Sequence, residues 1–364
     1  MNEFAGDGGE FGRFIKVWCT VFSSLTYCYY IARNIPKGFP RLLSVLPIVY
    51  IFSLLPLNLT SIHFTIGVGF FISWLANFKL LLFCYDSGPL SSNPLPVLPS
   101  STSSMTLLRF LAIACLPIMI KQSNPSSSFS SSSASVHIHR LSYYVMQGFF
   151  LGLIFYIYWY DEQYQHKQHF MIINFLYIFH MEIILELFLV IYAALARLIF
   201  NLEVEPPFGN MLVISSSFHE FWGRRWNKVV SSLLRSLIYE PVRRITKQSW
   251  GIYVAILATF SVSGLMHELI IFYIGRKIPQ GNLFVFFILH GIGMSVEIYL
   301  KRSSNGKCQL HRLGSQLILS GMLVLSCYYL INPSLERNRV DLMVNKEIAG
   351  LIKIIKSSSR HRTF

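Results

Sequence analysis

The sequence of 364 residues is too hydrophobic and too poor in charge for a soluble domain. Hydrophobic residues make up 53% of it and charged residues only 13%, whereas charged residues are about a quarter of a typical soluble domain. The formal net charge is +14, and most basic residues lie between apolar runs, where they would meet lipid phosphates or an anionic ligand. No basic stretch resembles a nucleic-acid-binding face. Composition therefore predicts a polytopic membrane protein that does not bind nucleic acid.

Apolar runs long enough to cross a membrane recur along the chain, since a helix needs about twenty residues to span ~30 Å of hydrocarbon. The run 107–120 is short, as in a half-spanning segment, and 170–200 is long enough to tilt or to include an interfacial turn. Open sheets cannot satisfy their backbone groups in lipid, so we predict an all-α protein with eight or nine transmembrane helices. The candidate spans are roughly 14–32, 42–59, 62–85, 107–120, 141–160, 170–200, 250–275, 281–300 and 314–332.

The connections predict one membrane-embedded domain, residues 1–333, followed by a basic carboxy-terminal tail, residues 334–364. Residues 122–140 form a serine-rich low-complexity loop. The stretch 201–249 interleaves basic and apolar residues at near-helical spacing, which is typical of an amphipathic helix at a membrane surface. The positive-inside rule compares the Lys and Arg residues of the connections on the two sides of the membrane. For nine spans, and with the tail excluded from the count, it places 201–249 in the cytosol, on the same side as the amino terminus.

Two polar stretches stand out in this apolar sequence and predict its chemistry: Phe-Trp-Gly-Arg-Arg-Trp-Asn at 221–227 and Ser-Gly-Leu-Met-His-Glu at 263–268. His267 lies within the span 250–275, and ionisable residues inside a membrane are functional by default. A neutral imidazole is suited to take a proton from an alcohol, although a histidine bonded to a neighbouring helix is the structural alternative. We predict that the two stretches meet and form one active site.

The remaining residues of the first stretch each have a functional and a structural interpretation. The amide of Asn227 could hold a carbonyl or a developing oxyanion, or it could cap a helix. Arg224 and Arg225 match the phosphates of an anionic co-substrate, or they could anchor the chain to anionic lipid. Trp222 and Trp226 lie on one face of a helix near this co-substrate, although interfacial tryptophans are common without any function.

Other ionisable residues predict structural roles. His290 lies in the next span, with Glu297 on the same helical face, and a bond between helices is the better interpretation. Glu268 points about 100° away from His267 on a helix, so pairing with Arg276 or with another helix is expected. The sequence lacks Cys-x-x-Cys, histidine boxes, a Gly-x-Ser-x-Gly elbow and a phosphate-binding glycine loop. We therefore expect no metal, no permanently bound cofactor and no acyl-enzyme.

Taken together, these motifs resemble the plant wax synthase family of the membrane-bound O-acyltransferase superfamily, which includes long-chain-alcohol O-fatty-acyltransferases and acyl-CoA:sterol acyltransferases. The likeness extends over nearly the whole chain and includes Trp-Leu-Ala-Asn-Phe-Lys at 74–79, Leu-Glu-Val-Glu-Pro at 202–206 and Leu-His-Gly at 289–291. Where members of the family usually have Gln-Asp before the first stretch, this chain has His219 and Glu220.

The resemblance implies a multi-pass enzyme of the endoplasmic reticulum that esterifies a lipid alcohol with a long-chain acyl-CoA. By this resemblance, the histidine of the superfamily corresponds to His267 and the asparagine of the superfamily to Asn227. The acceptor would be a fatty alcohol, giving a wax ester, or alternatively a sterol. The non-enzymatic alternative is a lipid or solute transporter whose buried histidines line a pathway, but no internal repeat is apparent.

Overall fold

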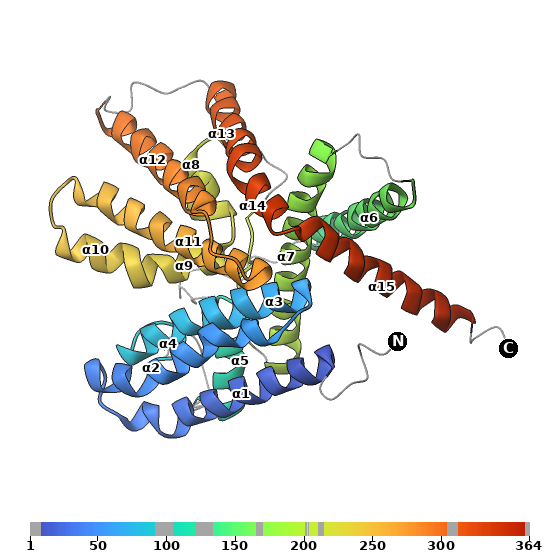
Figure 1. Ribbon diagram of the computed structural model, residues 1–364. Helices are drawn as coiled ribbons and strands as arrows, with labels where there is room; N and C mark the ends of the chain where they lie inside the picture. Colours follow the sequence, from blue (N-terminus) through green and yellow to red (C-terminus); the bar gives the residue numbers. More distant parts are fainter. Residues whose placement is uncertain are drawn as a thin grey trace.

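The computed structural model describes residues 9–91, 105–120, 134–164, 170–200, 202, 204–209, 215–303 and 312–360. Over these residues the chain is largely helical, and the β-structure found there is one isolated antiparallel bridge between Ile120 and Val204. This confirms the predicted all-α class. Figure 1 shows α1 to α5 packed together below α8 to α12, with α6, α7 and α15 to one side.

The described residues up to 200 form seven α-helices, several of them extended by 3-10 or π turns. A single continuous helix runs through α3, η3 and α4, whose middle segment has π geometry. The elements are α1 (Glu10–Tyr30), η1 (Ala32–Asn34), α2 (Phe39–Leu54), η2 (Leu55–Asn58), α3 (Ile62–Val68), η3 (Gly69–Ala76), α4 (Asn77–Cys84), α5 (Leu107–Cys115), α6 (Ala134–Tyr164) and α7 (Phe170–Phe200).

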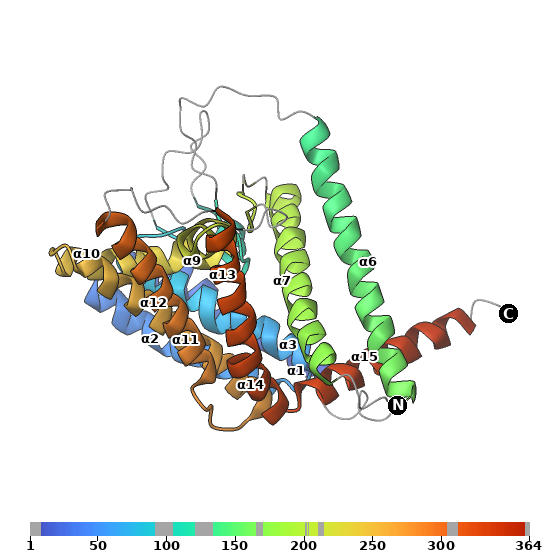
Figure 2. The ribbon, with the colours of Figure 1, turned by 90° about the horizontal axis from the view of Figure 1, so that it is seen from above.

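The second half carries both polar stretches. In Figure 2, α11, α12 and α13 run alongside one another, and α6 lies on the outer side of α7, away from them. The elements are α8 (Phe218–Glu220), η5 (Phe221–Arg225), α9 (Lys228–Leu234), η6 (Arg235–Tyr239), α10 (Glu240–Ile245), α11 (Gly251–Gly275), α12 (Asn282–Ser303), α13 (Arg312–Ser326), η7 (Cys327–Ile331), α14 (Asn332–Arg337) and α15 (Val340–Arg360).

Six helices in the described part of the chain are long and apolar enough to cross a membrane. The predicted span 107–120 contains only the 9 residues of α5, which is too short to cross a bilayer. Of the two alternatives given for 170–200, a tilted helix or an interfacial turn, the turn is absent, because α7 is one helix of 31 residues. The six candidate spans are Phe39–Asn58, Ile62–Cys84, Phe179–Phe200, Gly251–Gly275, Asn282–Ser303 and Leu313–Arg337.

The short helix α5 also changes the predicted topology. The carboxylate of Glu10 accepts hydrogen bonds from Thr60 N at 2.9 Å and Ser61 N at 2.8 Å. Arg276, which follows α11, donates to Leu59 O at 2.8 Å. The amino terminus of α1 therefore lies at the carboxy-terminal end of α11, whereas residues 215–249 precede the other end of this helix. The prediction that 201–249 shares a side with the amino terminus is wrong, because α5 does not cross.

Carboxylates satisfy the free N–H groups at helix starts, which apolar surroundings would otherwise leave unpaired. Glu268 accepts from Leu283 N at 2.7 Å and Phe284 N at 3.1 Å, at the start of α12. Glu297 accepts from Phe218 N at 2.7 Å, at the start of α8. The negative charge also complements the positive end of the helix dipole. These glutamates therefore fix where one helix begins against another.

Cations satisfy free carbonyl groups in the same way. Lys79 is 1% exposed, and its Nζ donates to Ile113 O at 2.7 Å and Leu116 O at 2.6 Å, at the end of α5. Arg41 donates to Ile35 O at 3.0 Å and Phe83 O at 3.1 Å. A helix that ends inside the bundle needs such donors, because its last carbonyls have no partner within the helix. Lys79 thus allows α5 to end inside the bundle.

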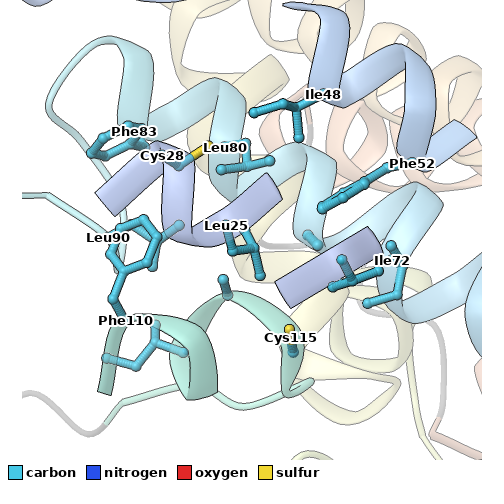
Figure 3. Packing of buried hydrophobic residues seen from close by; sticks show 14 of the residues in the cluster. Leu25, Cys28, Ile48, Phe52, Ile72, Leu80, Phe83, Leu90, Phe110 and Cys115 are labelled. Atoms are coloured by element: carbon cyan, nitrogen blue, oxygen red, sulfur yellow. The ribbon is translucent and has the colours of Figure 1, made fainter. Parts of the chain in front are cut away.

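The largest apolar cluster joins α1, α2, η3, α4 and α5, and Figure 3 shows side chains of all these elements meeting, among them Leu25, Phe52, Ile72 and Phe110. A second cluster places Val229 and Leu233 of α9 against Trp74. The apolar face of the predicted amphipathic helix therefore packs against protein rather than lying open to lipid.

The predicted carboxy-terminal tail is in part a packed helix. In α15, Val340, Val344 and Ile348 are buried in a cluster with Ile62 and Tyr158. This packing ties residues 340–348 to α3 and α6, so this part of the tail belongs to the bundle. The prediction of a basic tail rested on the Lys and Arg residues of this segment and did not take account of the apolar face formed by Val340, Val344 and Ile348.

Candidate active site

A cavity of about 500 Å³ lies between η3, the segment from α8 to η6, and helices α11 and α12. Apart from one leucine of α7, its wall is built by these elements. The lining residues are Phe70, Trp74, Leu185, His219, Trp222, Gly223, Arg224, Trp226, Asn227, Val230, Ser231, Leu234, Arg235, Tyr239, Ile252, Ile256, Thr259, Phe260, Ser263, His267, Phe287, Met294 and Ile298. The two polar stretches singled out in the sequence thus meet at one cavity.

His267 lies in the wall of this cavity with a fixed tautomer. Its Nδ1 lies 2.7 Å from the carbonyl oxygen of Ser263, one turn earlier in α11. A carbonyl only accepts hydrogen bonds, so Nδ1 carries the proton and the lone pair lies on Nε2. Nε2 has no hydrogen-bond partner in the described part of the chain and is not among its buried unpaired atoms. Nε2 is therefore open to a ligand in the cavity.

Three aromatic rings hold the imidazole of His267. The ring centroids of Phe287, Trp74 and Phe70 lie 4.4, 5.1 and 5.5 Å from it. Phe70 and Trp74 belong to the π-helical segment η3, a geometry often found at functional sites. These rings fix the imidazole and surround it with an apolar environment, which strengthens a hydrogen bond to a bound hydroxyl.

Glycine permits the close approach of helices beneath this site. A Cβ atom at Gly264 would lie 2.9 Å from the Cα atom of Phe284 in α12, and one at Gly69 would lie 2.6 Å from a methyl group of Ile270 in α11. At Gly264 the backbone of α12 passes so close to α11 that only a residue without a side chain fits. The glycine of the Ser-Gly-Leu-Met-His-Glu stretch therefore lets α12 bring Phe287 against His267.

Asn227 forms the turn between η5 and α9. Its backbone has φ 29° and its Oδ1 accepts a hydrogen bond from Val230 N at 3.2 Å, so it caps α9. Asparagine tolerates positive φ better than most residues. Its Nδ2 donates to no described residue, while the side chain lines the cavity. The structural and the functional interpretations of Asn227 are thus compatible, because they use different atoms.

The two arginines of the first stretch have different surroundings. Arg225 forms an ion pair with Glu220, whereas exposed Arg224 lines the cavity and has neither an ion pair nor a hydrogen bond among the described residues. A backbone hydrogen bond from Ser216 holds the pKa of Glu220 below its usual 4.5, so Glu220 stays ionised beside Arg225. Of the two arginines, Arg224 is the one whose side chain can meet an anion in the cavity.

His219 lies beside Arg224 and was not assigned a role from the sequence. Its ring lies over Gly223 and has no hydrogen-bond partner among the described residues. Burial, and then the positive charge of Arg224, lowers the pKa of His219 below its usual 6.5. Arg224, His219 and Arg235 give this part of the cavity a basic rim.

The other ionisable residues serve structure. Glu268 bonds the start of α12, as described above, and so pairs with another helix but not with Arg276. The expected bond from His290 to another helix is absent among the described residues, because its Nδ1 bonds Phe286 O of its own helix at 2.8 Å. Trp222 and Trp226 both line the cavity, with ring centroids 6.1 Å apart.

Several lining residues carried no signal in the sequence. Phe70 and Phe287 are two of 30 phenylalanines in the chain, so nothing distinguished them from core residues. Ser263 begins the second polar stretch and lies one turn before His267, but its carbonyl role does not depend on its side chain, so the stretch gave no sign of it. The spacing of four residues along a helix was the one available hint that Ser263 would lie on the same helical face as His267.

Comparison with known proteins gives consistent results. A model of the membrane bound O-acyl transferase family matches residues 204–289, which include both Asn227 and His267. Probable long-chain-alcohol O-fatty-acyltransferase 2 of Arabidopsis thaliana is 39% identical over 351 residues, which cover 95% of this chain and 97% of the relative. Acyl-CoA--sterol O-acyltransferase 1 of the same plant is 37% identical, with coverages of 89% and 90%.

The long-chain-alcohol O-fatty-acyltransferase of Simmondsia chinensis is 35% identical, and the match covers 92% of each chain. Similarity over almost the full length of these relatives removes the transporter alternative. The chain therefore belongs to the membrane-bound O-acyl transferase family.

Proposed function

We propose that the protein transfers the acyl group of a long-chain acyl-CoA to the hydroxyl group of a long-chain fatty alcohol, which yields a wax ester. The observation that carries this proposal is the hydrogen bond between His267 Nδ1 and Ser263 O, which leaves Nε2 as a free base in an apolar cavity. The names of the relatives give the reaction class, and the cavity supplies a site at which it can occur.

In the proposed mechanism, Nε2 of His267 takes the proton of the acceptor hydroxyl as its oxygen attacks the thioester carbonyl. The carbonyl becomes a tetrahedral oxyanion, which accepts a hydrogen bond from Nδ2 of Asn227. When the intermediate collapses, the C–S bond breaks and the CoA thiolate takes the proton back from His267. The histidine ends in its starting state, so no acyl-enzyme forms and no further acid is required.

The cap on α9 makes Asn227 suited to this task. Because its Oδ1 is bonded to Val230 N, the amide cannot rotate freely, and Nδ2 keeps one direction. A donor that is already oriented costs no reorganisation when negative charge develops. Losing one such donor lowers kcat by about 10²–10³-fold in other enzymes, and we expect the same range for Asn227→Ala.

The basic rim indicates which end of the cavity receives CoA. Arg224 is the cavity arginine without an ion-pair partner among the described residues, and a guanidinium binds phosphate oxygens well. We assign Arg224 to the CoA phosphates, with Trp222 and Trp226 as the adjoining wall, and Arg225 to the Glu220 pair that holds the turn. The acceptor then approaches His267 from the apolar part of the cavity, near Phe70 and Trp74.

This arrangement also gives an orientation in the membrane. With α1 and α6 added to the six long apolar helices, we propose eight spans and a half-spanning α5. The amino terminus and α15 then lie on the side opposite the segment 215–249. The positive-inside rule places this basic segment in the cytosol, where acyl-CoA is available, and we propose the endoplasmic reticulum as the membrane.

A sterol is the alternative acceptor, because one relative is named a sterol acyltransferase. Microsomes containing the protein, labelled long-chain acyl-CoA and a panel of fatty alcohols and sterols decide between the two. We expect wax esters to form with the fatty alcohols and to disappear with His267→Ala. Sterol esters alone would overturn the proposed acceptor, and no ester with any alcohol would overturn the proposed function.

A further inference from the structure

Two neighbouring rings each carry a buried polar atom without a hydrogen-bond partner in the described part of the chain: Nε1 of Trp222, which lines the cavity, and Nε2 of His290, which does not. The indole N–H of Trp222 can only donate. Nδ1 of His290 donates to Phe286 O at 2.8 Å, so Nε2 carries the lone pair and can only accept. The two unpaired atoms are therefore one donor and one acceptor.

The two rings are neighbours. Their centroids lie 5.4 Å apart with an interplanar angle of 69°. His290 is 0% exposed, and its other ring neighbours, Phe286 at 4.3 Å and Phe218 at 6.1 Å, offer no hydrogen bond. An unpaired buried polar group is costly, and such groups are rare in native proteins. A donor and an acceptor that are both unpaired, on two neighbouring rings, call for a common explanation.

Trp222 connects His290 to the catalytic stretch. Its indole lines the cavity, and its ring lies 5.7 Å from that of Phe287, which in turn lies 4.4 Å from the imidazole of His267. The carbonyl oxygen of Trp222 accepts from the Ser231 hydroxyl of α9 at 2.9 Å. A change in the position of Trp222 would therefore reach both His267 and the helix that Asn227 caps.

We propose that His290 is a positioning residue whose Nε2 accepts a hydrogen bond from one bridging water, which in turn accepts from Trp222 Nε1, and that this bridge fixes the indole as a wall of the cavity. His290 itself does not line the cavity, so it acts through Trp222 and not on the substrate. The inference rests on the proposed function only in taking this cavity as the site of acyl transfer.

The test uses three substitutions in the full-length protein. His290→Leu removes the acceptor, Trp222→Phe removes the donor but keeps a ring, and His290→Gln keeps an acceptor near the position of Nε2. We expect kcat to fall about threefold to tenfold with the first two, the range that one net hydrogen bond corresponds to. The KM for acyl-CoA should stay unchanged with His290→Leu, because His290 does not line the cavity. His290→Gln should stay within about twofold of the wild type, and the double variant Trp222→Phe/His290→Leu should be no worse than the worse single variant.

A spectroscopic measurement tests the bond without activity. The indole N–H vibrational band of Trp222, obtained as the difference between wild type and Trp222→Phe, should shift with His290→Leu and remain with His290→Gln. Additive losses in the double variant, or a band that His290→Leu does not move, would overturn the proposal. An active His267→Ala would instead overturn the proposed function, while the band shift would still stand.

Discussion

Replacing His267 tests the proposed mechanism most directly. The imidazole is held by Ser263 O through Nδ1 and by three aromatic rings, so Nε2 is already oriented before substrate binds. A positioned general base contributes about 10²–10⁴-fold in rate, which corresponds to roughly 3–5 kcal/mol of transition-state stabilisation. We expect kcat of His267→Ala to fall by this factor, while the KM for acyl-CoA, set at the basic rim, changes little.

The assay measures ester formation from labelled acyl-CoA and a fatty alcohol, at matched amounts of folded protein in microsomes. His267→Ala leaves a space among Phe70, Trp74 and Phe287, which lowers stability as well as activity. His267→Gln is the matched variant, because its amide fills part of this space and still hydrogen-bonds but cannot take a proton. Both variants should be nearly inactive, and His267→Gln should retain more folded protein.

Two results would refute this reasoning. An active His267→Gln would show that His267 is needed for packing or hydrogen bonding and not for proton transfer. A labelled acyl group that stays covalently attached to the wild-type protein would replace direct transfer by an acyl-enzyme. An inactive His267→Ala with no folded protein would decide nothing by itself, which is why the glutamine variant carries the test.

Three further predictions follow from other contacts. Arg224→Ala should raise the KM for acyl-CoA about 10- to 150-fold, since a charge-assisted hydrogen bond is lost, whereas Arg225→Ala should mainly lower the amount of folded protein. Equal KM values in both variants would contradict the division of roles. Lys79→Met should lower stability by about 1–3 kcal/mol for each carbonyl of α5 left unpaired, which thermal unfolding in detergent would measure and an unchanged unfolding temperature would disprove. Because the pKa of Glu220 is held below 4.5 in the folded protein, its ionised form stabilises the fold above that pH and the contribution is lost as the pH falls further. The unfolding temperatures of wild type and Glu220→Gln should therefore differ constantly from about pH 5.5 to 8 and converge below 4.5, and a gap that widens on acidification would show the sign to be wrong.

The sequence was informative where a residue contrasted with its surroundings. His267, Asn227, Trp222 and Arg224 are polar or amphipathic residues in or beside long apolar runs, and all four line one cavity. Burying a polar group in a membrane protein is costly, so those that remain carry information about function. The all-α class followed from the same contrast, since apolar runs of span length are unambiguous.

The aromatic residues of the site do not contrast in this way with the residues around them in the sequence. Phe70 and Trp74 form part of the aromatic wall around His267. In a chain rich in aromatic residues Phe70 is indistinguishable from a core position, and Trp74 was noted only as part of the stretch 74–79 that carries the family resemblance, without a role at the site. Their orientation depends on the π-helical segment η3, and hydrophobic periodicity does not predict a local change in helical repeat. The topology was wrong for a related reason, because an apolar run does not tell whether the helix continues across the membrane or, like α5, ends within the bundle.

The comparison of His267 with Glu268 gives a sharper criterion for a functional ionisable residue than its burial alone. Both are ionisable residues in the same span, and both would be functional by default. Glu268 uses its carboxylate on two backbone N–H groups of α12, and Glu297 does the same for α8, so their charge is explained by helix ends that need a partner. His267 also has a backbone partner, but this bond uses only Nδ1 and leaves Nε2 open at the cavity. A functional role is therefore indicated by an atom that the fold leaves available, and sequence cannot supply this information because it depends on where the neighbouring helices begin.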